Sequence, residues 1–295
     1  MLNLGIIGFG EAGYYLTKNL IEGSVQVYTF DVAVNQEDER AELIACRARE
    51  NSVILADSME DLFEKVEIVF CLTSAGSAVP VAKSIKSLLR PGQVYIDLNS
   101  TSPQTKEEIA AALDGAEGIF VEGAVMGAVP AKMTQVPINV CGPDAGVTAQ
   151  RLNAAGLNIH VVEGKIGSAS AMKMFKSILS KGMIALISET VFCTEKYGLT
   201  KPVLEDLINT INQMTFDGFC NYVVTQAAVH HVRLSKEMEE VVKTLDSLGE
   251  NSIMTQAVRD KFVWMTEQGF ADYFKERPAT YDEVVAVKRK MEGKK

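Results

Sequence analysis

The sequence is poor in the residues that most metal sites and disulfide frameworks use. It has 3 histidines and 5 cysteines among 295 residues, and no CxxC motif or cysteine–histidine pair has the spacing of metal ligands. The cysteines are odd in number and widely separated: Cys46, Cys71, Cys141, Cys193 and Cys220. We therefore expect no metal site, and we expect the cysteines to be small buried apolar residues in a reducing compartment.

A surplus of positive charge is also missing. The formal net charge is −9, which disfavours DNA, RNA or an anionic membrane as the main partner. The basic residues near the C-terminus, within 288–295, are interpreted as a solvated tail. We also expect no apolar run to approach the about 20 residues of a membrane helix, and residues 2–7 lack the basic flank of a signal peptide. These absences predict a soluble, cytoplasmic protein whose partner is a small molecule.

Short runs rich in β-branched residues alternate with helical patterns through the first half of the chain. The expected strands are residues 4–7, 25–30, 52–56, 68–72, 94–98, 119–121, 138–141 and 159–162. The helical patterns between them include residues 38–49, 79–89 and 104–113. This alternation predicts right-handed βαβ units and a mostly parallel sheet, the architecture of an α/β Rossmann-type domain.

The pattern changes after Gly167, where no convincing strand remains. A long apolar helical stretch covers residues 168–197, and further helical patterns cover residues 201–214, 216–232, 235–248 and 252–267. We therefore expect two domains joined by a long helix. The first, residues 1–163, is the dinucleotide-binding Rossmann domain, and the second, residues 164–295, is an all-α domain for substrate binding and dimerisation.

The turn after the first expected strand carries a complete GxGxxG motif, Gly8-Phe9-Gly10-Glu11-Ala12-Gly13. In a Rossmann fold the first glycine makes a tight turn, the second lets the backbone approach a pyrophosphate, and the third allows close packing of helix on strand. The motif alone is a weak indication, but here a strand precedes it and a helix follows it. We expect these six residues to bind the phosphates of NAD or NADP.

An acidic residue follows the next expected strand. Asp31 lies 18 residues beyond Gly13, where a carboxylate accepts a hydrogen bond from the ribose 2′-hydroxyl of NAD and repels the 2′-phosphate of NADP. Asp31 therefore favours NAD, with NADP as the alternative. An ordinary turn aspartate would explain the same residue.

Polar residues also follow two other expected strands. Leu72, Thr73 and Ser74 end one of them, and Asn99 to Ser102 end the next, before Pro103. Ligands of such sheets bind outside the carboxyl ends of the strands. We expect residues 72–74 and Asn99 to contact the cofactor. A serine or threonine of residues 100–102 should also cap the following helix.

A hydride-transfer enzyme that acts on an alcohol needs a group that takes the hydroxyl proton. The three histidines are poor candidates. His160 follows a predicted strand and is interpreted as a surface residue. His230 and His231 lie in a helical pattern, where the side chains of neighbours point about 100° apart. Lys173 is a better one, because apolar neighbours and a positively charged nicotinamide ring would both favour its neutral form. Periodicity alone does not separate it from Lys176 and Lys181, and a surface lysine at a helix end would explain the same pattern.

Four ordered motifs make the sequence resemble the β-hydroxyacid dehydrogenase superfamily, which includes 6-phosphogluconate and 3-hydroxyisobutyrate dehydrogenases. They are Gly8 to Gly13, Asp97 to Pro103, Val121 to Ala128 and Gly167 to Met174. The resemblance implies that Lys173 is the catalytic general acid and base. It further implies that Ser100, Thr101 and Gly127 anchor the substrate, and that Lys236 is a second lysine near the nicotinamide. A homodimer is implied as well.

Three positions depart from the family's pattern. Ser177 stands where the family has an asparagine four residues past the catalytic lysine, and Met126 and Ala128 replace a serine and a glycine of the substrate element. We still expect Met126 and Ser177 to line the substrate site. The loss of a hydroxyl predicts a less polar or differently shaped substrate. The predicted all-α domain, residues 164–295, resembles that of a branch of this superfamily in which the 6-phosphogluconate-dehydrogenase-like NAD-binding domain is joined to a distinct helical C-terminal domain.

These features together predict an NAD(P)-dependent oxidoreductase that transfers a hydride between nicotinamide and a small hydroxy acid or related carbonyl compound. An imine reductase-like enzyme is one alternative, although related imine reductases usually have another residue at the position of Lys173. A non-catalytic NAD(P)-binding sensor or scaffold is the other alternative. It would be favoured if Lys173 faced away from the nicotinamide.

Overall fold

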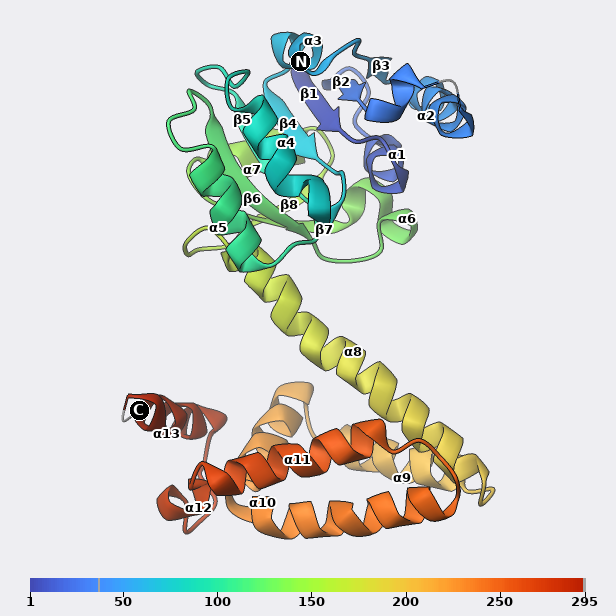
Figure 1. The fold of residues 1–295 in the computed structure, drawn as a ribbon, viewed down its shortest axis with the longest axis vertical. Coiled ribbons are helices and arrows are strands. Elements are labelled where there is room, and N and C mark those ends of the chain that lie inside the picture. The colour runs from blue at the N-terminus through green and yellow to red at the C-terminus, as the bar shows by residue number, and fades with distance from the viewer. Residues whose placement is uncertain (37, 294–295) are drawn as a thin grey trace. The chain divides into compact units, whose positions relative to one another are not determined.

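The computed structural model describes residues 1–36 and 38–293. By its internal contacts the chain divides into two compact units, Met1–Ile178 and Leu179–Lys295. Figure 1 labels their helices and strands.

The first unit is built around an eight-stranded sheet with the order β3-β2-β1-β4-β5-β6-β7-β8. The strands are β1 (Leu2–Ile7), β2 (Val25–Phe30), β3 (Ile54–Leu55), β4 (Ile68–Cys71), β5 (Val94–Asp97), β6 (Ile119–Val125), β7 (Pro137–Cys141) and β8 (Asn158–Val161). All neighbours are parallel except β6 and β7, which are antiparallel. The predicted α/β Rossmann-type fold with a mostly parallel sheet is therefore confirmed.

Helices cover both faces of this sheet. They are α1 (Glu11–Thr17), α2 (Glu39–Glu50), α3 (Met59–Lys65), α4 (Ala78–Ile85), α5 (Pro103–Ala112), α6 (Val129–Lys132) and α7 (Ala145–Ala154), with short 3₁₀ turns η1 (Val32–Asn35), η2 (Ala75–Ser77) and η3 (Met133–Gln135). Leu16, Ile44 and Leu152 bring α1, α2 and α7 onto one apolar core. Leu62 and Ile109 belong to a second core beneath α3, α4 and α5.

The order of the strands reverses direction beside β1. The chain builds β1, β2 and β3 outward on one side, then crosses back to β4 and continues outward on the other side. In such doubly wound sheets the crevice outside the carboxyl ends of the strands at this reversal is where ligands bind. The ends of β1 and β4 therefore mark the place to look for a cofactor.

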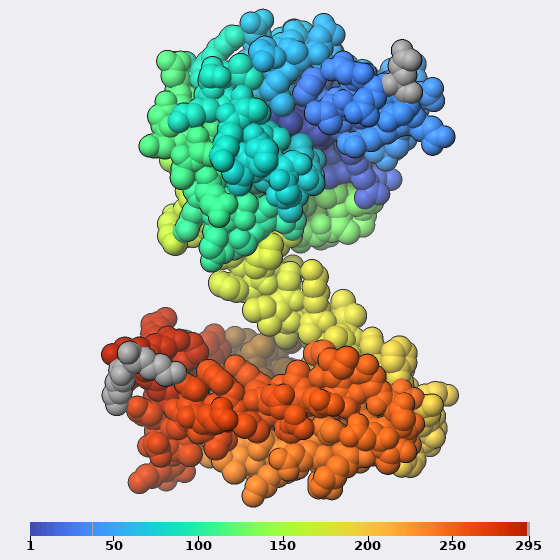
Figure 2. All heavy atoms as spheres, viewed as in Figure 1, coloured from blue at the N-terminus to red at the C-terminus, as the bar shows by residue number. Residues whose placement is uncertain are grey.

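The described part of the second unit is entirely helical. The long helix α8 (Ser168–Glu195) begins in the first unit and ends in the second, followed by α9 (Thr200–Asn212), α10 (Phe216–Ser247), α11 (Ile253–Glu267), α12 (Phe270–Tyr273) and α13 (Tyr281–Glu292). Ala228 of α10, Met265 of α11 and Val284 of α13 meet in one apolar core. Figure 2 shows the orange side chains of α10 and α11 lying against each other.

Two expectations for the helical half differ from the structure. Residues 216–247 form one helix of 32 residues, although the sequence pattern predicts two. The helix is continuous because Arg233 and Leu234, between the two predicted segments, are good helix formers. In addition, α8 is long and apolar enough to cross a membrane by length and composition alone, with a mean hydropathy of 1.3 in its most apolar window. The expectation that no apolar run approaches that length is therefore wrong for this helix.

Candidate active site

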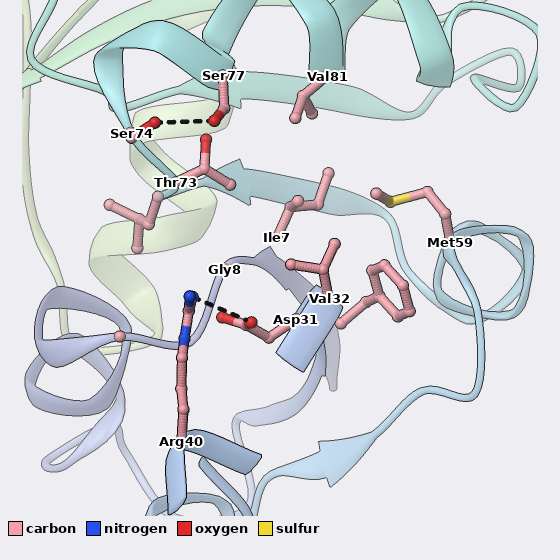
Figure 3. A pocket seen from close by; sticks show the side chains of 13 residues that line it. Ile7, Gly8, Asp31, Val32, Arg40, Met59, Thr73, Ser74, Ser77 and Val81 are labelled. Carbon is pink, nitrogen blue, oxygen red and sulfur yellow. Dashed lines mark hydrogen bonds and ion pairs between the residues drawn. The ribbon is translucent and has the colours of Figure 1, made fainter. Parts of the chain in front are cut away.

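A pocket of about 390 Å³ opens at the carboxyl ends of β1 and β4 (Figure 3). Its lining includes six residues that the sequence predicts to bind the cofactor: Gly8, Gly10, Asp31, Leu72, Thr73 and Ser74. These residues come from three separate stretches of the chain. The fold brings them together at the point where the strand order reverses.

The three glycines of the first turn leave room for close backbone approach. Gly8 has a φ of +86°, and a Cβ built on it would lie 2.8 Å from the carbonyl oxygen of Leu72, so no side chain fits there. A Cβ on Gly10 would meet no atom within 4 Å, and Gly10 faces the pocket. A Cβ on Gly13 would lie 3.0 Å from the ring of Phe9 and 3.2 Å from the carbonyl oxygen of Gly8. The turn therefore has the shape that a pyrophosphate requires.

The other residues of the glycine turn have different surroundings. Phe9 is completely buried in the core below the pocket, Glu11 is exposed and Ala12 is half-buried. None of the three side chains lines the pocket. The amide of Phe9 already donates to Asp31, so a contact between this stretch and a cofactor would involve the backbone of Glu11 or Ala12.

Asp31 connects the glycine turn to the residues after β2. Its side chain is 3% exposed. Oδ2 accepts a hydrogen bond from the amide of Phe9 at 2.9 Å, and Oδ1 accepts one from the amide of Ala33 at 3.0 Å. The guanidinium of Arg40 lies 3.4 Å from Oδ1 and, with 63% exposure, also lines the pocket (Figure 3). A carboxylate and a cation therefore lie side by side where the adenosine ribose of a dinucleotide would bind.

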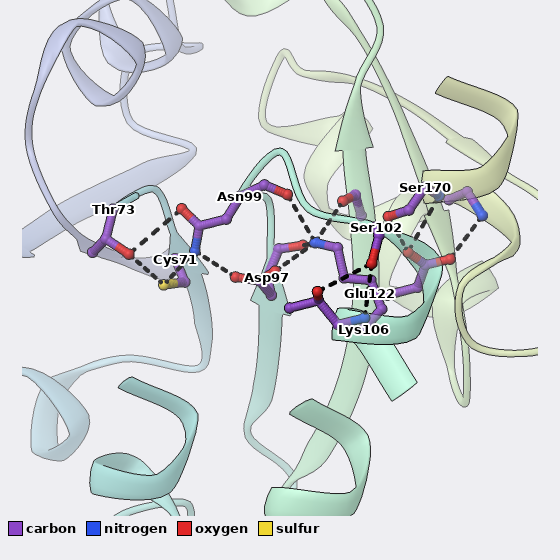
Figure 4. Close-up of polar contacts among 11 residues, drawn as sticks. Cys71, Thr73, Asp97, Asn99, Ser102, Lys106, Glu122 and Ser170 are labelled. Carbon is purple, nitrogen blue, oxygen red and sulfur yellow. Dashed lines mark hydrogen bonds and ion pairs between the residues drawn. The ribbon is translucent and has the colours of Figure 1, made fainter. Parts of the chain in front are cut away.

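A buried polar chain extends from the pocket under the ends of β4 and β5 (Figure 4). The hydroxyl of Thr73 lies 3.5 Å from Oδ1 of Asn99, whose Nδ2 donates to Oδ1 of Asp97 at 2.6 Å and to Sγ of Cys71 at 3.2 Å. Asn99 itself does not line the pocket. Burial raises the pKa of the Cys71 thiol, so this cysteine is a neutral member of the chain.

The loop between β5 and α5 presents one buried hydroxyl without a partner. Thr101 is 6% exposed, and its Oγ1 has no hydrogen-bond partner among the described residues. Such a group costs free energy unless a ligand or water completes its hydrogen bonding. Ser100 is exposed, and Ser102 caps α5 by accepting a hydrogen bond from the amide of Thr105. Capping therefore belongs to Ser102, whereas the hydrogen-bonding capacity of the Thr101 hydroxyl is left unsatisfied by the described residues.

Glu122 attaches the start of α8 to the sheet. This fully buried carboxylate of β6 accepts hydrogen bonds from the amide of Ala169 at 2.7 Å and from the hydroxyl of Ser170 at 2.7 Å. The amide of Ser170 is a further donor at 3.3 Å. A carboxylate at a helix N-terminus also interacts favourably with the helix dipole. Glu122 therefore fixes the first turn of α8, and the half-buried Lys173 lies in the next turn.

The remaining predicted substrate residues lie in the first unit. Met126 is half-buried beside Ala124, Cys141 and Ala169, and Gly127 is exposed. The hydroxyl of Ser177 donates to the carbonyl oxygen of Lys173 within α8 at 2.9 Å.

The second lysine that the resemblance implies, Lys236, lies on α10 in the second unit. It lines a groove together with Val229, His230, Val232, Arg233, Glu237 and Glu240. Its proposed role at the nicotinamide stays a prediction. Among residues 1–36 and 38–293, no three histidine, cysteine or acidic side chains are grouped so that they could hold a metal ion.

Three residues of the site were not predicted from the sequence. Arg40 belongs to no motif and approaches Asp31 only through the fold. Lys106 is fully buried beside Asp97, and one indication was present, since Lys106, Ile109 and the C-cap residue Leu113 follow one another at helical spacing. Glu122 lies within a recognised motif, but its role at α8 depends on a contact 47 residues along the chain.

The strand order, the glycine turn and the pocket at the reversal define a dinucleotide-binding protein of the Rossmann type. Residues 3–163 match the family described as the NAD binding domain of 6-phosphogluconate dehydrogenase, and the chain belongs to this family. Residues 195–265 match a domain of unknown function. The protein therefore has an NAD(P)-binding domain, as predicted.

Similar proteins indicate the class of chemistry. One solved structure, described as a conserved protein similar to 3-hydroxyacid dehydrogenases, is 29% identical, with a TM-score of 0.63 over 90% of this chain and 97% of that one. Mitochondrial 3-hydroxyisobutyrate dehydrogenase of Rattus norvegicus is 24% identical over 213 residues, or 70% of this chain and 61% of that enzyme. These likenesses support an NAD(P)-dependent dehydrogenase or reductase of the 3-hydroxyacid dehydrogenase kind.

Imine reductases share the fold. The imine reductase of Aspergillus terreus, solved with NADPH4 and an azepine, has a TM-score of 0.74 at 14% identity, over 93% of this chain and 99% of that one. At this level of identity the likeness concerns the fold alone.

Proposed function

We propose that the protein is an NAD(P)-dependent oxidoreductase that interconverts a small hydroxy acid and its carbonyl compound. The observation that carries the proposal is the pocket at the ends of β1 and β4, with its glycine turn and Asp31. The hydroxyl of Thr101 after the neighbouring β5, which has no hydrogen-bond partner among the described residues, supports a ligand-binding role for this loop. The relatives named above supply the reaction class.

In this proposal each part of the site has a distinct task. A bound nicotinamide supplies the hydride acceptor or donor. Gly8 and Gly10 hold the pyrophosphate through the backbone, and Ser100, Thr101 and Gly127 bind the substrate carboxylate. Lys173 takes the hydroxyl proton when the alcohol is oxidised and returns it to the oxygen when the carbonyl is reduced.

An imine reductase is the second candidate, because enzymes of that kind share this fold. The two candidates share the cofactor and differ in the acceptor, which is a C=O group in one and a C=N group in the other. The sequence favours the first, because Lys173 and the motif around it match the hydroxyacid dehydrogenase pattern.

The direct test is a titration with NADH and NADPH, followed by turnover assays. Small 3-hydroxy acids would be offered with NAD⁺ and NADP⁺, and cyclic imines with NADPH. Oxidation of a hydroxy acid supports the first candidate, and reduction of imines alone supports the second. Tight cofactor binding with no turnover of either class would identify a non-catalytic NAD(P)-binding protein instead.

The choice of cofactor depends on Asp31 and Arg40. We propose NAD as the preferred cofactor, because the carboxylate of Asp31 accepts from a ribose hydroxyl and repels a phosphate. Residual binding of NADPH would then depend on the guanidinium of Arg40. Arg40→Ala should raise the dissociation constant of NADPH about tenfold, which corresponds to about 1.4 kcal/mol, and change that of NADH less than twofold.

Fluorescence titration of both cofactors measures this difference. Arg49→Ala is the matched control, because it removes the same charge from an exposed position of the same helix α2. An equal loss of affinity for both cofactors in Arg40→Ala would contradict the assignment. A wild-type preference for NADPH would overturn the proposed role of Asp31.

We also propose that the protein is a homodimer that buries the apolar side of α8. Phe175, Ile178, Ile184 and Phe192 are 64–73% exposed within one chain, and none of the most apolar window of α8 is buried. Yellow side chains of this helix are visible at the surface in Figure 2. Monomeric proteins rarely expose an apolar patch of this extent, whereas interfaces between subunits are formed from such patches.

Negative charges introduced on the apolar side of α8 should separate the subunits. Ile184→Glu combined with Ile187→Glu should convert a dimer to a monomer at micromolar concentration, because two carboxylates would be buried without partners. Sedimentation velocity measures the mass, and Lys201→Glu at an exposed position of α9 is the control. A wild-type monomer, or a double variant that stays dimeric, would refute this surface as the interface.

A further inference from the structure

A charged pair is completely buried at the edge of the proposed site. The ammonium of Lys106 and the carboxylate of Asp97 are both 0% exposed and in direct contact. The remaining acceptors around the ammonium are three backbone carbonyl oxygens, those of Asp97 at 2.8 Å, Asn99 at 3.0 Å and Gly123 at 3.2 Å. Figure 4 shows Lys106 of α5 reaching to the end of β5 and to β6.

Packing alone does not account for this pair. A buried ion pair pays a large desolvation cost, and apolar residues of similar volume often replace such a pair without loss of stability. Lys106 shares its helix face with Ile109, which is buried in an apolar core. An apolar residue would therefore fill the space of Lys106, but it could not bind three carbonyl oxygens. What the lysine adds is that it holds the backbone of these three residues in place.

That backbone belongs to the loop with the predicted ligand-binding groups. The carbonyl oxygen of Asn99 accepts from Lys106 and also from the amide of Thr101 at 2.9 Å. Thr101 carries the unpartnered buried hydroxyl. A fixed Asn99 carbonyl therefore fixes the turn that orients this hydroxyl.

Lys106 is also connected to the cofactor pocket through hydrogen bonds between side chains. Asp97, which pairs with Lys106, accepts a hydrogen bond from Asn99 Nδ2 at 2.6 Å. The Oδ1 of Asn99 then lies 3.5 Å from the hydroxyl of Thr73, and Thr73 lines the pocket. The charged pair therefore sets the orientation of the Asn99 side-chain amide. This orientation turns Oδ1 of Asn99, and not Nδ2, toward Thr73.

We propose that Lys106 is a positioning residue for the cofactor and substrate loop. It holds residues 99–101 in the conformation that presents Thr101 to the substrate, and it orients Asn99 toward Thr73 at the cofactor. This inference rests on the proposed function, because it assigns Lys106 to the same site. Lys106 itself contacts neither ligand.

The test removes the charged pair as a unit. Lys106→Met alone leaves the carboxylate of Asp97 buried without its cation, so it should lower the unfolding temperature strongly. In the double variant Lys106→Met with Asp97→Asn, neither charge remains, and the unfolding temperature should recover toward the wild-type value. The control is Arg151→Met with Glu67→Gln, a half-exposed pair that joins α7 to the residue before β4.

Two measurements on the folded double variant distinguish positioning from stability. Hydrogen exchange should accelerate about tenfold at the amides of residues 98–102, and the dissociation constant of NADH should rise about tenfold, with exchange elsewhere in the sheet unchanged. Both should stay at wild-type values in the control. Lys106→Gln, which can keep one hydrogen bond to the Asn99 carbonyl, should give intermediate values for both.

The outcomes separate this inference from the proposed function. If the folded double variant exchanges and binds NADH as the wild type does, the positioning role of Lys106 is overturned. If the double variant does not fold, wild-type exchange at residues 98–102 in Lys106→Gln overturns it equally. If the wild-type protein binds neither NADH nor NADPH, the proposed function fails, while the exchange measurement still decides whether Lys106 fixes the loop.

Discussion

Lys173→Ala should lower turnover by roughly two to four orders of magnitude, the usual contribution of a general acid and base. The affinity for NADH should change little, because the proposed cofactor contacts lie at the ends of β1, β2 and β4. The loss should appear mainly in kcat, since the lysine acts on a proton that moves during the chemical step. Turnover with the best substrate and a parallel NADH titration measure the two effects.

Lys176→Ala is the matched control for this experiment. Lys176 lies on the same helix α8, three residues further along, and is exposed. It should keep turnover within a factor of two or so of the wild type, because surface substitutions usually have small effects. Equal losses in both variants would indicate that the positive charge of α8 matters and Lys173 does not. Full activity of Lys173→Ala would refute the catalytic role.

The first half of the fold was predictable because its local patterns and its tertiary structure agree. The β-branched run 25–30 forms β2 with the predicted ends, and the glycine turn after β1 leads into α1 as expected. Short elements escaped the prediction. Helix α3 has only seven residues, too few for a periodic pattern, although Ser58 caps it by accepting from the amide of Asp61.

Residues of the site were predictable where a short motif or a strand end carries them. Gly8 and Asp31 lie in such motifs, and both line the pocket. Arg40 and Lys106 depend on contacts that only the folded chain creates, and a lysine in a helical pattern is normally solvated. The assignment of Lys236 to the nicotinamide comes from resemblance and stays a prediction. A sequence motif indicates where the backbone must adopt a particular conformation, whereas the partner of a charged side chain is determined by the tertiary structure.

Glu122→Gln should lower both the stability of the protein and the kcat of the reaction in which Lys173 transfers the proton. The buried carboxylate binds two amides and one hydroxyl at the start of α8. Glutamine keeps one acceptor oxygen and places an NH₂ group against the remaining donors. With each charge-assisted hydrogen bond worth about 1.5–3 kcal/mol, the free energy of unfolding should fall by roughly 2–4 kcal/mol. The first turn of α8 should then shift, and Lys173 with it.

The chain supplies a close control in its second unit. Glu189 of α8 accepts hydrogen bonds from the amides of Met254 and Thr255, at 2.9 and 2.8 Å, at the start of α11. Glu189→Gln removes the same chemistry from another helix N-terminus, so it should also lower the unfolding temperature. Its kcat at a temperature where both variants are folded should match the wild type, whereas Glu122→Gln should lose at least tenfold. Equal kcat values for the two variants would show that the contact with Glu122 stabilises α8 without setting the position of Lys173.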